Sequence, residues 1–443
     1  MAVIPRPMLR TFLLCIFGAL VLFFIARDYL QFKTPLSYFA SRQLTVYLNP
    51  SAATIHKNGT KRELLLLQML FRHGHRAPFM LYPTDPNNET FWKEGLGTLT
   101  RLGRVQHYRL GRHLQDRYKD FITTNPKEVE LVSAESSRTQ HGAYSFLAGL
   151  YSPKEEFQFT NELLWQPIIS KNSGKYNNIL TRSKCERLEK EFKALKNSKL
   201  ANDTRARFEG IYKFWSTMSG RVIDDWHLAN DLGKTFACEK KYNLTIPDWA
   251  YKYWKELQIQ TALNYYFHYG TKELLRYRIG PLIGFMVEKM KDRIKMNREK
   301  RVYIYSAHGS YIAQTLMILN RYNWREPPPA STMVLELWKE EDDYTIRWLY
   351  FNSTSPEIHV EPPYIIHFDI CGEFCSLSKF MAYTEQFIPK NYTAECNDTS
   401  KVFKSLDLIA DPTTVLGSCS GKLQISHFIL TLIVSYYSIK RIF

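Results

Sequence analysis

A short segment with two arginines around a histidine carries the clearest chemical signal in this sequence. Residues 72–78 read Arg-His-Gly-His-Arg-Ala-Pro. A guanidinium binds phosphate oxygens as a planar fork, and an imidazole nitrogen held between two such forks can attack phosphorus. Arg72, His73 and Arg76 are therefore candidates for a phosphate-binding site with its own nucleophile. The plainer interpretation is a solvated basic cluster, and the surrounding elements decide between the two.

Each candidate group follows an expected strand. The apolar run 63–71 is typical of a buried strand that ends in this loop. A second strand, 129–134, leads to Arg138, and a third, 302–307, leads to His308. Ligands of open α/β sheets bind at the carboxyl ends of the strands. The pattern therefore predicts that one sheet edge brings these side chains together.

The strand signals divide the body of the chain into an α/β domain and an insertion. We expect the α/β domain to be assembled from residues 60–150 and 295–400, with further strands at 333–338 and 344–351. The polar, aromatic-rich segment 151–294 between the two parts predicts a mainly helical cap. The fold class is thus α/β, with a mixed, mostly parallel sheet flanked by helices.

Apolar runs near both termini suggest a membrane or secretory route. Residues 1–30 contain the run 11–26 between arginines, which predicts a signal peptide or an N-terminal anchor. Its 16 residues fall short of the ~20 that span a bilayer comfortably, which favours a cleaved signal. After a linker at 401–422, the run 423–439 ends in Lys-Arg and predicts a single transmembrane segment. A buried terminal helix and a glycolipid-anchor signal are the alternatives for this run.

Sequons and charge agree on the compartment and on the class of partner. The formal net charge is +16, which suits an anionic partner such as a phosphate ester or a membrane surface. Sequons spread over the whole body indicate lumenal or extracellular exposure, which argues against nucleic acid as a partner. The seven expected glycosylation sites are Asn58, Asn88, Asn202, Asn243, Asn352, Asn391 and Asn397.

These motifs, in this order, resemble the histidine acid phosphatases, the histidine phosphatase superfamily members that include the prostatic and lysosomal acid phosphatases. The family signature Arg-His-Gly-x-Arg-x-Pro is met in full at 72–78. The similarity continues through 99–118, 133–139, 305–308 and the CxxxC at 371–375. The resemblance implies a phosphoglycerate mutase-like α/β fold with a helical cap, a phosphohistidine intermediate, and neither metal nor cofactor.

The resemblance also implies a role for each candidate residue. It makes His73 the nucleophile and assigns Arg72, Arg76, Arg138 and His308 to the phosphoryl oxygens. In acid phosphatases an aspartate follows the histidine that corresponds to His308, and it protonates the leaving oxygen. This chain has Gly309 and then Ser310 there, so it meets neither this pattern nor the His-Ala-Glu variant of inositol polyphosphate phosphatases.

The missing acid leaves three hypotheses open. The chain is a slow phosphatase, an enzyme that takes a carboxylate from elsewhere, or a phospho-ligand-binding module without catalysis. A positioned proton donor typically contributes about 10²–10⁴-fold to the rate, so the difference is large. Glu135, which follows the second strand, is one candidate donor, although a structural or solvated glutamate is the simpler interpretation.

The cysteines fit an oxidising compartment but depart from the family in one place. Cys15 lies in the leader, and the other six, an even number, suit disulfides. The resemblance implies the pairs Cys371–Cys375 and Cys185–Cys396. The family partner of Cys238 falls near Ser331, so Cys238 either pairs with Cys419 or stays free.

Taken together, the sequence predicts an acid phosphatase that hydrolyses small phosphate monoesters in the secretory pathway. We expect a single-pass membrane protein with a lumenal or extracellular catalytic domain, at the lysosome or cell surface, or a secreted form. The alternative is a catalytically weak, membrane-tethered phospho-ligand-binding glycoprotein, and either a monomer or an oligomer is compatible with the sequence. His107, His113 and His141 lie among basic residues without a carboxylate cluster, which argues against a metal site.

Overall fold

The computed structural model describes most of the body of the chain. The described residues are 45–46, 54–57, 60–171, 178–180, 184–296 and 300–397. The elements from β2 onward belong to one compact unit, 46–417. The terminal segments 1–30 and 423–439, the linker 401–422, Asn58 and Cys419 lie outside the described residues. Within those residues, no helix combines the length and the apolar character needed to cross a membrane.

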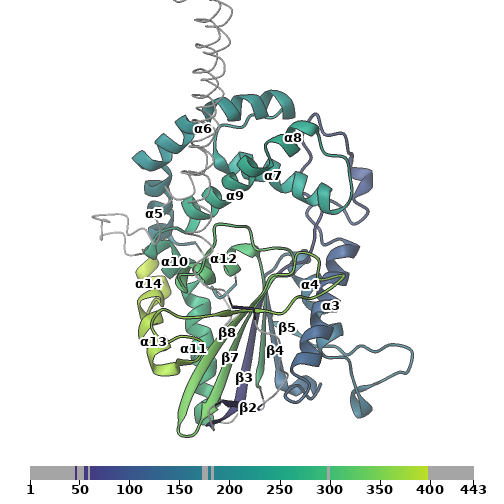
Figure 1. Cartoon of the computed structure of the whole chain (residues 1–443), viewed down its shortest axis with the longest axis vertical. Coiled ribbons are helices and arrows are strands. Elements are labelled where there is room, and N and C mark those ends of the chain that lie inside the picture. The colour runs from purple at the N-terminus through teal and green to yellow at the C-terminus, as the bar shows by residue number, and fades with distance from the viewer. Residues whose placement is uncertain are drawn as a thin grey trace, which may run out of the picture. The chain divides into compact units, whose positions relative to one another are not determined.

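A long central strand organises the sheet and delivers the first motif. The leucine-rich run forms β3 (Thr60–Arg72), which pairs in parallel with β6 (Val302–Ala307) and antiparallel with β7 (Thr332–Glu340). On its other side β6 pairs in parallel with β4 (Val129–Ser133). The three strands expected to deliver the candidate groups are thus parallel neighbours. Their carboxyl ends meet at one edge of the sheet (Figure 1).

The sheet is mixed, as predicted, but it is not mostly parallel. Among the described strands, β3–β6, β6–β4 and β4–β5 pair in parallel, whereas β2–β3, β3–β7, β7–β8, β8–β9 and β8–β10 pair antiparallel. From one side to the other its order is β9-β8-β7-β3-β6-β4-β5, with β10 beside β8 and β2 beside β3. The strands β7, β8 and β9 form an antiparallel extension of the parallel centre. The remaining strands are β1 (Thr45–Val46), β2 (Thr54–Lys57), β5 (Ser170–Lys171), β8 (Asp343–Phe351), β9 (Tyr364–Ile366) and β10 (Cys375–Ser376).

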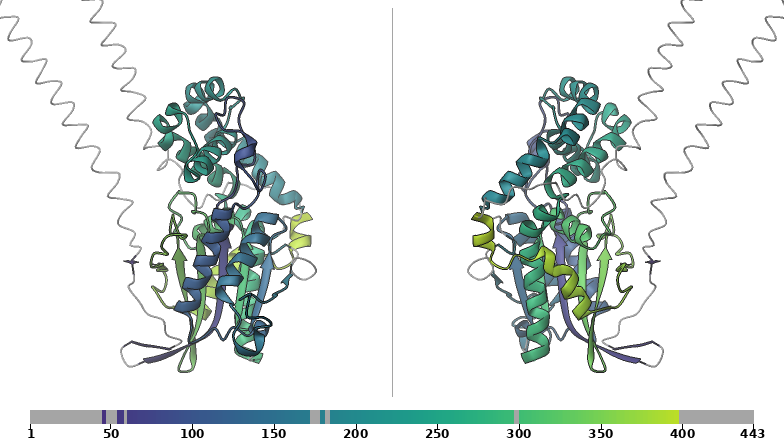
Figure 2. Two further views of the ribbon diagram at one scale, coloured as in Figure 1. Left: turned by 90° about the vertical axis from the view of Figure 1, so that its right-hand side faces the viewer. Right: turned by 90° about the vertical axis from the view of Figure 1, so that its left-hand side faces the viewer.

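Helices cover both faces of the sheet. Figures 1 and 2 show α3 (Arg101–Arg117) and α4 (Ser137–Leu150) on one face, and α11 (Gly280–Met296) and α13 (Leu377–Thr384) on the other. The helix α12 (Gly309–Ile318) follows β6 directly and packs against β3. Short 3-10 helices lie in the connections, at η1 (Glu89–Phe91), η2 (Pro126–Glu128), η3 (Glu155–Phe157) and η5 (Glu385–Phe387).

The inserted segment 151–294 contains helices and also parts of the sheet layer. Its strand β5 pairs with β4, and its last helix, α11, packs against β3. The helices that lie beyond the carboxyl ends of the strands are α6 to α9 (Figures 1 and 2). Helices outside the two sheet faces are α5 (Glu186–Lys196), α6 (Lys199–Ser219), α7 (Trp226–Lys241), α8 (Asp248–Lys252), α9 (Trp254–Tyr269), α10 (Lys272–Arg278) and α14 (Tyr392–Asn397).

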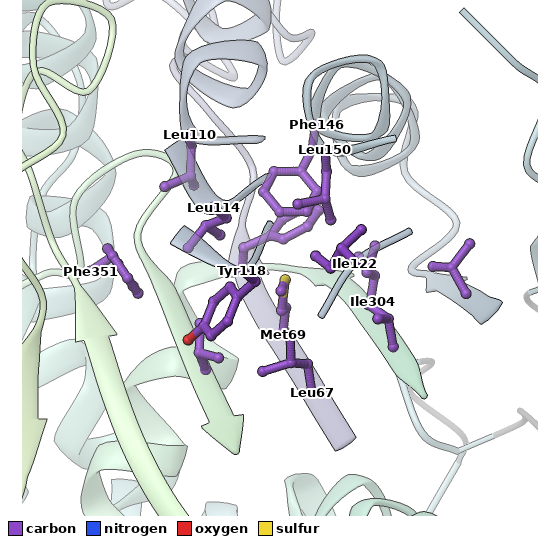
Figure 3. Packing of buried hydrophobic residues seen from close by; sticks show 14 of the residues in the cluster. Leu67, Met69, Leu110, Leu114, Tyr118, Ile122, Phe146, Leu150, Ile304 and Phe351 are labelled. Atoms are coloured by element: carbon purple, nitrogen blue, oxygen red, sulfur yellow. The ribbon is translucent and has the colours of Figure 1, made fainter. Parts of the chain in front are cut away.

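Alternating side chains of β3 fill the core on one face and anchor the strand on the other. Leu67 and Met69 belong to the buried apolar cluster with side chains of β6, α3 and α4 (Figure 3). Gln68 faces the opposite way, donating to the Met286 carbonyl at 2.9 Å and accepting from the Tyr305 hydroxyl at 2.7 Å. Burial of each large apolar side chain contributes about 1.5–3 kcal/mol. The end of β3, where His73 emerges, is therefore firmly held.

The structure contains two disulfides among the described cysteines, and both are the pairs that the resemblance implied. One links Cys185, the residue before α5, to Cys396 in α14, and the other links Cys371 to Cys375. Cys238 forms no disulfide with a described cysteine. Among the described sequons, the asparagine of Asn352 is half-buried, and those of Asn88, Asn202, Asn243, Asn391 and Asn397 are exposed.

Candidate active site

His73 is the first residue after β3, and the backbone holds it on two sides. Its amide donates to the Ala307 carbonyl at 3.1 Å, and its carbonyl accepts from the Ala330 amide at 3.2 Å. These bonds tie the residue to the end of β6 and to the start of β7. The side chain is only 5% exposed. The fold thus gives the imidazole a fixed position at the sheet edge.

One hydrogen bond sets the tautomer of this imidazole. Nδ1 of His73 lies 2.8 Å from the Gly74 carbonyl oxygen. A carbonyl can only accept, so the proton of the neutral ring resides on Nδ1. The other nitrogen, Nε2, keeps its lone pair. An uncharged ring with a free Nε2 lone pair is the form that a histidine nucleophile requires.

The charges around His73 keep the ring in that neutral form. Burial lowers the pKa of His73 well below its ordinary value, and positive charge on Arg72, His308, Arg138 and Arg76 lowers it further. Desolvation and like charge both disfavour protonation of an imidazole. His73 is therefore unprotonated in mildly acidic solution as well as at neutral pH.

Gly74 allows the motif loop to pack closely against α3. A Cβ atom there would lie 2.4 Å from the Gly103 carbonyl oxygen, and one on Gly103 would lie 2.2 Å from the His75 carbonyl oxygen. The loop and the first turn of α3 thus touch backbone to backbone. Glycine at 74 therefore allows α3 to approach the loop closely.

The second histidine of the motif points away from the first. The His75 ring stacks against Tyr242, with centroids 5.3 Å apart and planes 5° apart. Its Nδ1 lies 2.8 Å from the Thr100 hydroxyl, and its Nε2 donates to the Cys238 carbonyl at 3.1 Å. Both ring nitrogens are engaged in these bonds. His75 therefore anchors the loop to α3 and α7 and offers no second nucleophile.

The expected arginines gather at the same edge. The Arg76 guanidinium lies 3.9 Å and the Arg138 guanidinium 5.0 Å from the centroid of the Phe79 ring, so both contact one aromatic ring. Burial, followed by the positive charges of Arg76 and Arg72, lowers the pKa of Arg138 to about 10. Mutual repulsion of this kind is the environment that a multiply charged anion would relieve.

Two guanidinium nitrogens in this group are buried without a hydrogen-bond partner among the described residues. They are Nε of Arg72 and Nε of Arg138. Leaving a buried donor unsatisfied costs about 1–3 kcal/mol, and more when the group is charged. A phosphate carries acceptor oxygens and negative charge, so its chemistry fits these donors. A phosphate would also suit the amino terminus of α4, because helix amino termini favour anions. Arg138 lies in the first turn of this helix.

The last predicted pair, His308 and Gly309, starts α12. His308 is the N-cap residue, and its ring faces His73 edge-on with centroids 5.6 Å apart. Gly309 is buried, and its φ angle lies outside the positive range that favours glycine. A Cβ atom on Gly309 would lie 3.1 Å from the Tyr265 hydroxyl and 3.1 Å from Cδ of Arg72. Neighbours from the cap and from β3 therefore lie close to the point at which a side chain on residue 309 would begin.

Sequence reasoning missed an acidic group at the site. Glu326, in the connection between α12 and β7, pairs with Arg72 at 3.0 Å, and Lys234 of α7 lies 3.6 Å from the same carboxylate oxygen. Burial would raise the pKa of Glu326, but the positive charges of Arg72, Lys234 and Arg76 outweigh it and hold the pKa below its ordinary value. Glu326 is thus an anion, and it orients Arg72 rather than donating a proton.

The other candidates are either exposed or packed against aromatic rings. Glu135 follows β4 with an exposed side chain, and His141 is exposed on α4. His107 is fully buried against Phe71, with ring centroids 4.8 Å apart. His113 packs edge-on against Phe351. Among the described residues, no three histidine, cysteine or acidic side chains are grouped as a metal site would need.

Most of the chain is similar to known histidine phosphatases. Residues 79–351 match the family model described as the histidine phosphatase superfamily, branch 2. Mouse prostatic acid phosphatase is 31% identical over 383 residues, which cover 83% of this chain and 97% of the relative. Human lysosomal acid phosphatase is 28% identical over 357 residues, covering 76% of this chain and 80% of that protein.

Solved structures share the fold at lower identity. A Hafnia alvei phytase in complex with myo-inositol hexakis sulphate superposes with a TM-score of 0.58 at 14% identity, covering 74% of this chain and 98% of the phytase. A Citrobacter braakii phytase superposes with a TM-score of 0.57 at 17% identity and covers 76% of this chain. The sheet and cap described above are thus a histidine phosphatase architecture. The chain belongs to branch 2 of the histidine phosphatase superfamily, as a member of the histidine acid phosphatase family.

Proposed function

We propose that this protein hydrolyses phosphate monoesters through a phosphohistidine at His73. Nε2 of His73 attacks phosphorus, a P–N bond forms, and the P–O bond to the leaving alcohol breaks. Water then attacks the phosphohistidine and releases inorganic phosphate. The observation that carries this proposal is the Nδ1 bond of His73 to Gly74, which leaves Nε2 unprotonated beside the arginines.

The surrounding cations would act in both steps. Arg72, Arg76 and Arg138 would hold the phosphoryl oxygens, and their charge would stabilise the oxygens as the P–O bond breaks. His308, edge-on to His73, would contact the same oxygens from the start of α12. These roles need neither metal nor cofactor, and the substrate class they support is a small phosphate ester.

Gly309 favours one competing function, a phospho-ligand-binding glycoprotein with little catalysis. The residues proposed to hold the phosphoryl oxygens are all present in the sequence, whereas the position of the family's carboxylate acid holds a glycine. A rate assay on the purified chain separates the two functions. We expect steady hydrolysis of 4-nitrophenyl phosphate by the unmodified protein and none by His73→Ala. His141→Ala, on the exposed surface of α4, is the matched control and should keep full activity.

A different result would replace the enzyme with the binding module. If the unmodified protein binds vanadate or phosphate but releases no nitrophenolate between pH 4 and pH 8, hydrolysis is contradicted. Retained turnover in His73→Ala would contradict the nucleophile and leave the family unaffected.

We also propose that the chain enters the secretory pathway and exposes this domain to the lumen or the cell exterior. Two disulfides and five exposed sequon asparagines support this compartment. Tethering by residues 423–439, or by 1–30, is part of the same proposal. Endoglycosidase treatment of protein expressed in animal cells should increase its gel mobility, and alkaline carbonate should leave it in the membrane pellet. Unchanged mobility would contradict lumenal exposure, and release into the supernatant would contradict the anchor.

A further inference from the structure

A cap tyrosine lies next to the position at which the family's acid would begin. The Tyr265 hydroxyl of α9 is 3.1 Å from the position that a Cβ atom on residue 309 would take. The same position lies 3.1 Å from Cδ and 3.3 Å from Nε of Arg72. An aspartate there would have to share this space with the phenol. Glycine at 309 and tyrosine at 265 thus fit together sterically.

The Tyr265 side chain is buried near the site, and its hydroxyl makes no hydrogen bond to a described residue. Its side chain is 4% exposed, and the Lys234 ammonium lies 5.5 Å from its ring centroid. Among the described residues, none forms a hydrogen bond with this hydroxyl, which is also absent from the buried unsatisfied atoms. The phenol oxygen therefore has no hydrogen bond to a described residue, and it lies next to Gly309 and Arg72.

Its surroundings keep the phenol protonated until it acts. Burial raises the pKa of Tyr265 well above its ordinary value, the negative charge of Glu326 raises it further, and Arg72 opposes both. Tyr269, Tyr322 and Tyr350 are further ionisable groups near the ring. A neutral phenol is a donor of one proton, and the adjacent Arg72 can stabilise the phenolate that donation leaves.

We infer that Tyr265 is the proton donor to the leaving oxygen in this protein. The inference rests on the proposed function and names the group that replaces the carboxylic acid. As Nε2 of His73 bonds to phosphorus and the P–O bond breaks, the electron pair stays on the leaving oxygen. That oxygen takes the phenolic proton and departs as an alcohol. The phenolate then takes a proton from the water that attacks the phosphohistidine, which returns Tyr265 to its starting form.

A phenol suits this role when the leaving group is strongly basic. Tyrosine is among the side chains that act as general acids. An alkoxide is a stronger base than a phenolate, so the proton moves in the favourable direction once the P–O bond weakens. A nitrophenolate leaves without a proton and gains nothing from the donor. The role therefore predicts dependence on the leaving group, which a purely structural tyrosine would not produce.

The first test compares an alkyl and an aryl phosphate. Tyr265→Phe removes only the hydroxyl. We expect its turnover of an alkyl substrate such as glycerol 2-phosphate to fall by about 10²-fold or more. We expect phosphorylation of His73 by 4-nitrophenyl phosphate to keep its rate within about threefold. Tyr322→Phe is the matched control, because its hydroxyl is buried without a hydrogen-bond partner among the described residues, and it should keep both activities.

The second test uses the steric relation between the two positions. Gly309→Asp alone places the new side chain against the Tyr265 hydroxyl and Arg72, so neighbours must shift by a few tenths of an ångström. In the double variant Gly309→Asp/Tyr265→Phe the hydroxyl is gone and a carboxylic acid is restored. We expect the double variant to regain at least about tenfold of the alkyl turnover lost in Tyr265→Phe. Such rescue is non-additive, as expected for groups in contact.

The outcomes separate this inference from the proposed function. If the unmodified protein hydrolyses neither substrate, the proposed function fails and this role fails with it. If it hydrolyses both, and Tyr265→Phe loses neither or loses both equally, the function stands and Tyr265 is not the donor. Hydrolysis of the aryl substrate alone by the unmodified protein would also overturn the donor. If Tyr265→Phe does not fold, 3,5-difluorotyrosine at 265 should change alkyl turnover and leave the aryl phosphorylation rate unchanged, and equal effects would overturn the role.

Discussion

At the scale of residues, the site is built from cations that are expensive to bring together. Arg72, Arg76 and Arg138 lie at one sheet edge beside the neutral ring of His73, and burial together with their positive charge lowers the pKa of both Arg138 and His73. One carboxylate, Glu326, offsets part of this charge through its pair with Arg72. The arrangement favours a doubly charged ligand over a neutral one, because the ligand supplies the missing negative charge.

Arg138→Ala should weaken anion binding more than it slows chemistry. The change removes a charged donor whose Nε is buried without a partner among the described residues, and it leaves His73 in place. Loss of a charged hydrogen bond costs about 1.5–3 kcal/mol, which corresponds to about 10- to 150-fold in the inhibition constant of inorganic phosphate. Arg109→Ala, exposed on α3, is the control. An unchanged constant for Arg138→Ala would remove this residue from the phosphate site.

Phe79→Ala should loosen two phosphate ligands at once. The ring is 54% exposed yet lies under both the Arg76 and the Arg138 guanidinium. Cation–π contacts at exposed sites contribute about 0.5–1 kcal/mol each, so we expect phosphate inhibition to weaken by about fivefold. Phe159→Ala, with a ring that is 63% exposed, should have no such effect. Equal inhibition of the two variants would show that the ring does not position the arginines.

At the scale of elements, strands with a regular apolar pattern could be predicted from the sequence, whereas very short strands and site residues in loops could not. The leucine-rich run could be recognised as a buried strand, and β4 and β6 were found because each is a short apolar run before a polar turn. Two-residue strands such as β5 and β10 carry no periodicity, so only tertiary pairing reveals them. Glu326 was missed because it lies in a proline-rich connection whose path cannot be derived from pattern.

The same limit applies to residues that the cap contributes. Arg138 and His308 were found because each follows a strand, and the rule for sheet edges then places them. Lys234 and Tyr265 lie within helices α7 and α9, where they read as ordinary helix positions. Their approach to Glu326 and Gly309 depends on how the cap helices pack over the strand ends. Chain order alone does not supply that packing.

The two disulfides should differ in their effect on stability. Cys185 and Cys396 are separated by 211 residues, and Cys371 and Cys375 by 4. Loop-closure entropy gives about 5 kcal/mol for the first bridge and about 2 kcal/mol for the second. Denaturant unfolding of Cys185→Ser/Cys396→Ser should therefore show the larger loss, and Cys371→Ser/Cys375→Ser the smaller. The reverse order would mean that the long loop stays compact in the unfolded chain.

At the scale of the whole molecule, buried histidines make stability depend on pH. Burial lowers the pKa of His107 to about 3 and, with the charge of Arg76, lowers that of His75 to about 4. In the unfolded chain these groups titrate near 6.5. Between the two values the unfolded state binds the additional protons, so the free energy of unfolding falls as the pH falls from about 6.5 towards 4. The protein without bound phosphate should therefore be more stable at pH 7 than at pH 5.

Removing one of these histidines should flatten that dependence. His107 binds a proton in the unfolded chain but not in the folded protein over this range. Its protonation therefore lowers the free energy of unfolding by about 2 kcal/mol between pH 7 and pH 5. His107→Leu is expected to lose less stability than the unmodified protein over this interval, by about that amount. Denaturant unfolding at the two pH values measures it, with the exposed His141→Ala as the control. Parallel pH profiles for His107→Leu and the unmodified protein would show that His107 is not buried as a neutral ring.

The most direct test of the account is to trap and locate the covalent intermediate. Purified protein would be mixed with ³²P-labelled 4-nitrophenyl phosphate and quenched within milliseconds in alkaline denaturant, in which a phosphoramidate bond survives. Peptide mapping by mass spectrometry would then locate the label. We predict one phosphoryl group on His73, and none in His73→Ala. Label on another residue, or turnover of the substrate with no labelled protein at any time, would contradict the proposed mechanism.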